Sequence, residues 1–344
     1  MKSWMGVQRF LGSNRFRFRH GQTIHAARIG IGIFASLGIA WWLHLPNGVW
    51  VAISFLIVMA SLQHHGNIQR RAVERAVGTV IGAVAGVGIL GLQSWLGSTA
   101  LTFAVMAAVC GICGFYAVGR GGYTAQLVAI TLVVVAGFGT DPIATGLWRA
   151  VDVLIGIAIA LALARAFPLY ALAFWRLAMA DALTRAAGLL EEDALGEPPG
   201  GRPSNAEAAT NGFIALSPVL QTLRGLMPPV SRESGLAMGR IETIQRHLRH
   251  ALSLMELATS QQTAARPAAD GLLEKPAGSP LARGEASVIA RRLRALGEGL
   301  ESGSWAAPWE APPPAETSLA ARLIGQELAA LRTELVAAPE LWRR

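Results

Sequence analysis

Two arginines, Arg75 and Arg149, each stand at the head of a long apolar run in two similar stretches of sequence. The first stretch reads RAVGTVIG and the second, seventy-four residues later, reads RAVDVLIG, with five of eight positions identical. A charge costs free energy in a protein core and costs more in lipid, so each arginine needs compensation. A guanidinium in a low-dielectric passage can bind a carboxylate through two parallel donors. Arg75 and Arg149 are therefore candidate substrate-binding residues, and a structural ion pair or an interfacial anchor is the alternative for both.

Two acidic residues lie close to these arginines in the sequence. Asp152 follows Arg149 by three residues, and Glu74 stands beside Arg75 and four residues after Arg70. At these spacings on a helix we expect local ion pairs. A carboxylate that loses its arginine partner to an anionic substrate takes up a proton more readily. Asp152 and Glu74 are therefore candidate proton-coupling residues.

The remaining ionisable residues in the apolar part of the chain suggest fewer functions. Arg28 and His25 lie in the first apolar segment, and Arg28 is a third candidate for binding the substrate. His64 and His65 are adjacent, so they lie on different faces of a helix and make a poor metal pair. The sequence contains no nucleophile elbow, zinc signature or phosphate-binding loop. We expect no catalytic residues, no metal and no cofactor, and hence no enzyme.

The composition indicates a membrane protein. Of the 344 residues, 52% are hydrophobic and only 15% are charged, and the mean hydropathy is +0.41. A soluble globular chain rarely combines these values. The formal net charge is +8, but Lys and Arg are spread between apolar segments and separate helices, which argues against nucleic acid as a partner. The lipid bilayer is the expected partner instead.

Six apolar windows have lengths near the twenty residues that cross a bilayer. Their limits are Ile24–Leu43, Gly48–Leu62, Ala76–Leu96, Thr99–Val118, Thr124–Phe138 and Leu147–Phe167. They predict a transmembrane domain of six helices over residues 24–167, after a basic flank at residues 1–23. The second and fifth windows are the shortest, which in transporters marks a binding site near the bilayer midplane. Local thinning of the bilayer is the alternative explanation.

Basic residues in the short flanks predict the orientation in the membrane. The opposite loops, HLPN, QSWLGS and GTDPIATG, contain no Lys or Arg. Nine basic residues fall on the other side: Lys2, Arg9, Arg15, Arg17, Arg19, Arg70, Arg71, Arg75 and Arg120. By the positive-inside rule, we expect the N-terminus and everything after the sixth segment to be cytoplasmic.

After Phe167 the chain becomes polar and predicts a cytoplasmic helical domain over residues 168–344. Four amphipathic segments are separated by GEPPGGRPSN, TAARPAAD and SGSWAAPWEAPPP. Three segments carry apolar residues at intervals typical of a buried helix face. These residues are Ile241, Ile244, Leu248 and Met255, then Ile289, Leu293, Leu296 and Leu300, and then Ile324, Leu328, Leu331 and Leu335. The pattern fits a helical bundle or a dimerising helical tail.

The two arginine stretches belong to a longer repeat. VAISFLIV at 51–58 precedes the first, and VAITLVVV at 128–135 precedes the second. Segments two and three therefore correspond to five and six, with repeats at about 24–96 and 99–167. Because a unit of three spans is odd, the second repeat enters the membrane from the opposite side and is inverted. Such repeats place equivalent groups at opposite mouths of a pathway, here Arg75 near the cytoplasm and Arg149 near the outside.

Glycines recur at four-residue spacing in the third segment. These are Gly78, Gly82 and Gly86, and Gly156 begins a similar stripe of small residues in the sixth segment. Stripes of this kind let helix backbones approach closely. We expect these glycines to be helix-packing positions, with the third and sixth segments as the inner pair of the bundle.

The run from Leu45 to Gly86 resembles a family of bacterial inner-membrane proteins, the fusaric acid resistance and aromatic acid exporters. This family is related to the aluminium-activated malate transporters of plants. With the echo after Arg149, the resemblance covers about residues 24–167. The matching positions are Pro46 and Trp50 at the opening of the second segment, then an arginine-rich loop, and then Arg75, Gly78, Thr79 and Gly82 in the pattern R-x-x-G-T-x-x-G.

The resemblance implies export of aromatic carboxylic acids or related organic anions, often with a periplasmic adaptor protein. It also makes Trp50 a candidate substrate-binding residue beside the three arginines. Longer exporters of this family carry two membrane halves in one chain, so we expect a homodimer here. Two alternatives stay open: a passive dimeric anion channel of the malate-transporter type, and a membrane-anchored scaffold whose cytoplasmic helices bind a partner.

Overall fold

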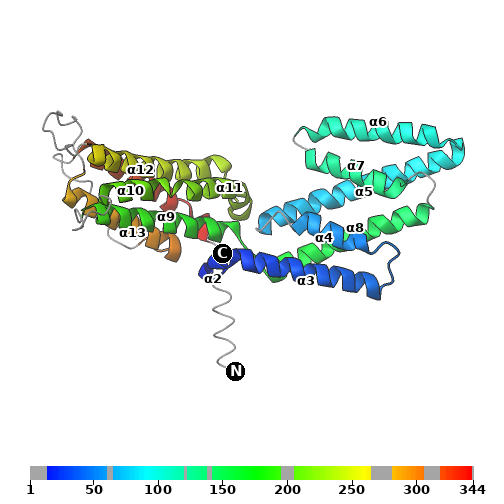
Figure 1. Cartoon of the computed structure of the whole chain (residues 1–344), viewed down its shortest axis with the longest axis horizontal. Coiled ribbons are helices and arrows are strands. Elements are labelled where there is room, and N and C mark those ends of the chain that lie inside the picture. Colours follow the sequence, from blue (N-terminus) through cyan, green and yellow to red (C-terminus); the bar gives the residue numbers. More distant parts are fainter. Residues whose placement is uncertain are drawn as a thin grey trace, which may run out of the picture. The chain divides into compact units, whose positions relative to one another are not determined.

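The computed structural model describes residues 14–59, 65–119, 122–137, 142–194, 205–264, 281–305 and 318–342. Over these residues the secondary structure is entirely helical, which confirms the all-helical expectation. The chain divides into two compact units, Met1–Tyr170 and Ala171–Arg344 (Figure 1). We call them the N-terminal unit and the C-terminal unit. Lys2, Arg9, His64 and Arg120 lie outside the described residues.

The described residues of the N-terminal unit form six apolar helices at the positions of the six predicted segments, preceded by the short helix α2 (Asn14–Arg19). They are α3 (Gly21–Trp42), α4 (Val49–Met59), α5 (His65–Leu96), α6 (Thr99–Ala117), α7 (Gly122–Ala136) and α8 (Ile143–Ala166). Among the described helices, α3, α5, α6 and α8 are long and apolar enough to cross a membrane. Helices α4 and α7 have 11 and 15 residues, hence lengths of about 17 and 23 Å against a hydrocarbon core of about 30 Å. These two helices correspond to the second and fifth apolar windows, which are the shortest in the sequence.

The two halves of the N-terminal unit, α3 to α5 and α6 to α8, make equivalent helix contacts (Figure 1). The contact of α5 with α7 corresponds to that of α8 with α4, and the contact of α3 with α4 corresponds to that of α6 with α7. The contact of α3 with α8 likewise corresponds to that of α6 with α5, and α5 and α8 contact each other. Each short helix is thus held between longer ones.

Gly82 brings α5 against the backbone of the short helix α7. A Cβ atom placed on Gly82 would lie 2.6 Å from the carbonyl oxygen of Val128 and 2.7 Å from Thr131 Cβ. Gly78 and Gly86, one turn to either side, face an earlier and a later turn of α7. Because the contacts advance together along both helices, α5 and α7 run parallel.

Gly156 makes the same contact between α8 and the short helix α4. A Cβ atom on Gly156 would lie 2.3 Å from the carbonyl oxygen of Val51 and 2.9 Å from Ser54 Cβ. Val51 and Ser54 occupy the places in VAISFLIV that Val128 and Thr131 occupy in VAITLVVV. The repeated sequences therefore form the same helix contact twice.

The glycines pack against the short helices α7 and α4. Helices α5 and α8 do contact each other, but larger apolar side chains fill the space between them. Ile68 and Ala72 of α5 lie in one buried cluster with Val153 and Ile157 of α8. Phe55 of α4 belongs to the same cluster, so α4 completes this core.

Much of the surface of the N-terminal unit is apolar. Phe34 of α3, Val84 of α5 and Phe115 of α6 are 81%, 70% and 80% exposed. In the four candidate spans, at most 44% of the apolar window is buried inside the protein. Exposed apolar surfaces of this extent mark contact with a membrane or another protein. The unit therefore suits a lipid environment, as expected for a multi-pass membrane protein.

The C-terminal unit contains six α-helices and one 3-10 helix among its described residues, so the expectation of four amphipathic segments is wrong. They are α9 (Ala171–Ala194), α10 (Asn205–Ile214), α11 (Ser217–Ser234), α12 (Met238–Ala264), α13 (Arg283–Ser302), α14 (Leu319–Val336) and η1 (Pro339–Trp342). The stretch before TAARPAAD forms three helices because the chain turns before Ser217 and again at Gly235. Gly235 has a φ of 79°, a left-handed conformation that glycine adopts without strain and that commonly ends helices.

The three predicted apolar stripes of the C-terminal unit are all buried within it. Every residue named for them in α12, α13 and α14 is at most 2% exposed. Leu293 and Leu328, in the middle of two stripes, are fully buried. The stripes therefore form the core of a helical bundle within one chain and not the seam of a dimerising tail.

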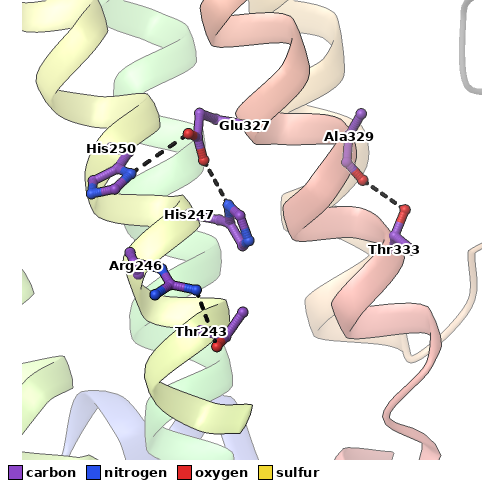
Figure 2. Close-up of polar contacts among 7 residues, drawn as sticks. All are labelled: Thr243, Arg246, His247, His250, Glu327, Ala329 and Thr333. Carbon is purple, nitrogen blue, oxygen red and sulfur yellow. Dashed lines mark hydrogen bonds and ion pairs between the residues drawn. The ribbon is translucent and has the colours of Figure 1, made fainter. Parts of the chain in front are cut away.

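Carboxylates connect helices at the edges of this bundle. Glu285 at the start of α13 accepts hydrogen bonds from Ala282 N at 2.9 Å, Ser318 N at 2.7 Å and Ser318 Oγ at 2.9 Å. Glu327 of α14 accepts a 2.6 Å hydrogen bond from Nδ1 of His247 and lies 3.5 Å from Nδ1 of His250, both on α12 (Figure 2). The first set joins α13 to α14, and the second joins α12 to α14.

We expect Gly82→Ala and Gly156→Ala to destabilise the protein by about 1–3 kcal/mol each, because the added methyl group would overlap the backbone of a neighbouring helix. Gly88→Ala is the matched control, since nothing lies within 4 Å of a Cβ at that position; it should be neutral or stabilising by up to about 1 kcal/mol. Thermal unfolding in detergent measures all three. Equal stability of the Gly82 and Gly88 variants would contradict the close contact with α7.

We expect Glu285→Gln to destabilise the junction of α13 and α14 by about 1 kcal/mol at neutral pH. Burial raises the pKa of Glu285, but the hydrogen bonds from Ser318 and Ala282 outweigh it and bring the pKa below its ordinary value. The stabilisation is therefore present above the unfolded pKa of about 4.3 and is lost as the pH falls through the lower folded pKa. Amide hydrogen exchange at the starts of both helices measures this, with the exposed Glu298→Gln as control. A loss of protection in the wild type that begins above the unfolded pKa would contradict the assignment.

Candidate functional site

Arg75 is buried in the N-terminal unit with an incomplete set of partners. Its side chain is 1% exposed, and its Nε and Nη1 atoms make no hydrogen bond. Tyr123 of α7 is an electrostatic neighbour, and the guanidinium of Arg71 lies 3.8 Å above the same ring. Burying a guanidinium whose donors are unsatisfied is costly. This favours a binding function for Arg75 over an interfacial anchor.

Asp152 is the buried carboxylate of α8, and the ion pair expected with Arg149 does not form. Asp152 is fully buried, and neither carboxylate oxygen has a hydrogen-bond partner. Arg149 instead donates from Nη1 to the carbonyl oxygen of Val134 at 2.8 Å. Asp152 lies one turn before Gly156, so it is on the face of α8 that packs on α4. It is the only buried acidic residue among the described residues of the N-terminal unit.

Glu74 has a different environment from Asp152. Its Oε1 accepts a 2.7 Å hydrogen bond from Nε of Arg70, and its Oε2 lies 4.0 Å from Nη1 of Arg71. The neighbouring Arg75 is therefore not its partner, although both residues stand together in the sequence. Glu74 is partly exposed and already paired, whereas Asp152 is buried and unpaired. Of the two acidic candidates, Asp152 has the environment of a proton carrier in a membrane.

Three buried hydroxyl groups lie near these charges. A search of the sequence for charged residues does not identify them. Thr79 lies one turn after Arg75 on α5, Thr131 lies on α7 and Ser54 on α4; each is at most 2% exposed and has no hydrogen-bond partner. Thr131 and Ser54 are equivalent positions of the repeat. The sequence identifies them by their matching place in the repeat, where residues 51–54 read VAIS and residues 128–131 read VAIT. Hydroxyl groups can donate to or accept from a passing polar ligand.

Arg75 and Arg149 lie toward opposite ends of the N-terminal unit. A Cβ on Gly146, at the start of α8, would lie 2.5 Å from the carbonyl oxygen of Val135, near the end of α7. Helix α8 therefore runs antiparallel to α7, and hence also to α5. Because each arginine stands in the first half of its helix, the two guanidinium groups belong to opposite ends.

A cavity of about 230 Å³ lies where α3 begins and α8 ends. Its walls are apolar apart from two guanidinium groups, those of Arg17 and Arg28. Arg28 is 1% exposed, and Nη1 of Arg17 donates to the carbonyl oxygen of Pro168 at 3.3 Å. Apolar walls with convergent cationic groups suit a small apolar molecule that carries a carboxylate. The cavity contains Phe16 and Phe167 in its walls, so aromatic contacts are available to such a molecule.

The structure does not gather the predicted substrate-binding residues in one place. Arg28 lines the cavity, but Arg75, Arg149 and Trp50 are not among its described lining residues. Trp50 is half-buried at the start of α4. The residues of α4 that belong to the buried cluster lie toward the other end of this helix. The residues are therefore distributed along the unit, as groups along a pathway are, and not concentrated in a single pocket.

Residues 34–163 match the family described as fusaric acid resistance protein-like, and they extend from α3 to α8. Most of the N-terminal unit is therefore similar to the fusaric acid resistance protein-like family. The resemblance seen in the sequence is thereby confirmed. Of the candidate substrate-binding and proton-coupling residues, Arg28 alone lies outside the matched segment of this family.

A curated relative of this chain is the inner membrane protein YeeA of Escherichia coli (strain K12). The two sequences are 28% identical over 259 residues, which is 73% of this chain and 69% of the relative. Because the N-terminal unit ends at Tyr170, an alignment of this length includes part of the C-terminal unit. The similarity to an inner membrane protein and the apolar helices together indicate a multi-pass protein of the inner membrane.

We expect Asp152→Leu to leave the protein as stable as the wild type, or more stable, because it replaces a buried carboxylate without partners by an apolar side chain. A gain of about 1 kcal/mol would raise the unfolding temperature by about 2–4 °C. Ala150→Asp, which puts a carboxylate at another buried position of α8, is the opposite control and should destabilise. Marked destabilisation by Asp152→Leu would instead assign Asp152 a structural role.

Proposed function

We propose that this protein exports aromatic carboxylates or related organic anions from the cytoplasm in exchange for protons. Its family and its inner-membrane relative support a membrane transporter in general. The observation that carries the finer proposal is the burial of Arg75 and Asp152 with incomplete hydrogen bonding on two helices of one membrane unit. Such residues inside a membrane mark substrate and proton pathways.

The proposed pathway uses six spans arranged as two inverted repeats. The matched helix contacts of the two halves support this arrangement, and so do the equivalent contacts at Gly82 and Gly156. Helices α4 and α7 are then short spans near the centre of the unit, where their ends leave backbone groups available to a ligand. We infer alternating access between the two ends, with Arg75 toward one and Arg149 toward the other.

The proposed orientation has both termini in the cytoplasm. Arg71 lies against Tyr123 at the start of α7, and Arg17 against Pro168 after the end of α8. Because α8 is antiparallel to α5 and α7, these basic residues share one end of the unit. A positive end is cytoplasmic by the positive-inside rule.

In the proposed cycle, the carboxylate first binds in the cavity lined by Arg17 and Arg28 and next pairs with Arg75. The unsatisfied Nε and Nη1 of Arg75 supply donors for it. Asp152 binds a proton from outside and releases it inside after the anion has left. One anion moving out and one proton moving in transfer two charges, so each 100 mV of membrane potential contributes about 4.6 kcal/mol.

We also propose a homodimer and a periplasmic adaptor as partners. The homodimer rests on the family resemblance, since longer members of the family carry two membrane halves in one chain. The exposed apolar side chains of α3 and α6, Phe34 and Phe115 among them, offer surface to a second copy as well as to lipid. The adaptor rests on the family resemblance alone.

A passive anion channel is the second candidate function. It is favoured by the burial of two cationic groups, Arg28 and Arg75, against a single buried carboxylate in the described part of the N-terminal unit. A channel needs only a positive lining, whereas a proton-coupled carrier also needs a titratable group in the pathway. Asp152 therefore separates the two functions experimentally.

We expect Asp152→Asn to abolish accumulation of radiolabelled 4-hydroxybenzoate in inside-out vesicles under an imposed pH gradient, while exchange of the anion at equal concentrations persists. The amide keeps the size of the side chain but cannot carry a proton. Glu74→Gln is the matched control and should retain wild-type accumulation within about twofold, because Glu74 is partly exposed and already paired with Arg70. Wild-type accumulation in the Asp152 variant would contradict proton coupling, and uncoupled anion current in the wild type would identify a channel.

We expect Arg75→Ala to lower both accumulation and exchange by about tenfold or more, because it removes charge-assisted hydrogen bonds to the carboxylate. Arg70→Ala removes an exposed arginine of the same helix and should change transport less than twofold, as surface pairs contribute little. Transport in the two variants is compared at equal amounts of protein in the vesicles. Full exchange activity of the Arg75 variant would show that this arginine does not bind the substrate.

A further inference from the structure

A second cavity lies wholly within the C-terminal unit, between α11 and α12. Its volume is about 340 Å³. Its lining residues are Arg224 and Met227 of α11 and Glu242, Gln245, Arg246 and Arg249 of α12. Three guanidinium groups from two helices therefore face one space, beside a single carboxylate.

Among the described residues, no ion-pair partner neutralises these arginines. Arg224 and Arg249 form no ion pair, and Arg246 makes only a 3.4 Å contact from Nη2 to Thr243 Oγ1 (Figure 2). Glu242 also makes no ion pair, although it stands one turn from Arg246. Three positive charges against one negative charge leave an excess of two positive charges around the cavity, which favours an anion.

Gln245 provides an independent sign of a ligand. Its side chain is 8% exposed, and its Nε2 donates to the carbonyl oxygen of Leu220 at 3.3 Å. Its Oε1 is buried and has no hydrogen-bond partner, although Gln245 lines the cavity. A buried acceptor without a donor is rare in native proteins. A donor such as a hydroxyl group of a molecule bound beside Gln245 would satisfy this acceptor.

We propose that this cavity binds a phosphate ester that carries hydroxyl groups, as a ligand distinct from the transported anion. Guanidinium groups match phosphate oxygens in pairs, and Gln245 Oε1 and Glu242 accept hydrogen bonds from hydroxyl groups. Met227 is the only apolar side chain among the described lining residues, so an aromatic carboxylate or a nucleotide base finds little apolar wall there. The ligand is either a soluble sugar phosphate or the phosphoglycerol head group of a lipid, which share this chemistry.

The test measures binding and not transport, so its outcome is independent of the proposed exporter function. The full chain in neutral detergent is titrated calorimetrically with glucose 6-phosphate, inorganic phosphate and glucose. In a second arm, it is reconstituted in nanodiscs with or without phosphatidylglycerol before glucose 6-phosphate is added. We expect saturable binding of glucose 6-phosphate that weakens as salt is raised.

Two substitutions separate the parts of the site. Arg249→Gln should weaken binding of both glucose 6-phosphate and inorganic phosphate by about tenfold, the effect of losing a charge-assisted hydrogen bond. Gln245→Met should weaken glucose 6-phosphate severalfold and leave inorganic phosphate unchanged. Arg322→Gln, which removes an exposed arginine of α14 outside the cavity, is the control and should bind as the wild type does. Thermal unfolding checks that each variant is folded.

The outcomes decide the proposal in either direction. Competition between phosphatidylglycerol and glucose 6-phosphate, abolished by Arg249→Gln, assigns the site to the lipid head group, and binding of glucose 6-phosphate alone assigns it to a soluble ligand. Absence of saturable binding in both arms overturns the proposal. Equal affinity for inorganic phosphate and glucose 6-phosphate, unchanged by Gln245→Met, overturns the role of the hydroxyl groups.

Discussion

The N-terminal unit depends on the close approach of helix backbones at Gly82 and Gly156. At each position a side chain of any size would overlap the carbonyl oxygen of a short helix, α7 or α4. Without these contacts the short helices would have little to hold them, since exposed apolar helices gain no hydrophobic stabilisation from association in lipid. The same contact formed twice by the same sequence fixes the positions of all six helices, because each short helix also touches its two other neighbours.

The buried charges take their positions from these contacts. Arg75 and Arg149 each stand seven residues, or two helical turns, before the glycine of their helix. The repeat differs one turn before the glycine, where α5 has Gly78 and α8 has Asp152. Because the equivalent position holds glycine in α5 and aspartate in α8, only α8 has a buried carboxylate there. The two helices are otherwise similar, and this one difference places the buried carboxylate on α8 alone.

The two units are stabilised by different physical effects. In the C-terminal unit the stripes of Leu and Ile are fully buried, so removal of apolar surface from water supplies most of the stability. Carboxylates then join neighbouring helices, Glu285 at the start of α13 and Glu327 in the middle of α14. In the N-terminal unit the apolar side chains point outward as well as inward, and close packing at small residues replaces the hydrophobic effect. A buried polar group is consequently more costly there, which is why Arg75 and Asp152 stand out.

By itself, the sequence determined the helical class, the places of six apolar helices and the buried stripes of the C-terminal unit, because hydropathy and periodicity are local properties of the chain. It also identified the repeat and the glycines, whose spacing needs no partner to be recognised. Only the tertiary structure decided which groups pair: Arg149 with a carbonyl oxygen of α7, Glu74 with Arg70, and Asp152 with no hydrogen-bond partner. It also decided that the glycines face the short helices and that one turn at Gly235 divides a segment. Pairing depends on which helix faces meet, and that is set by packing between distant segments.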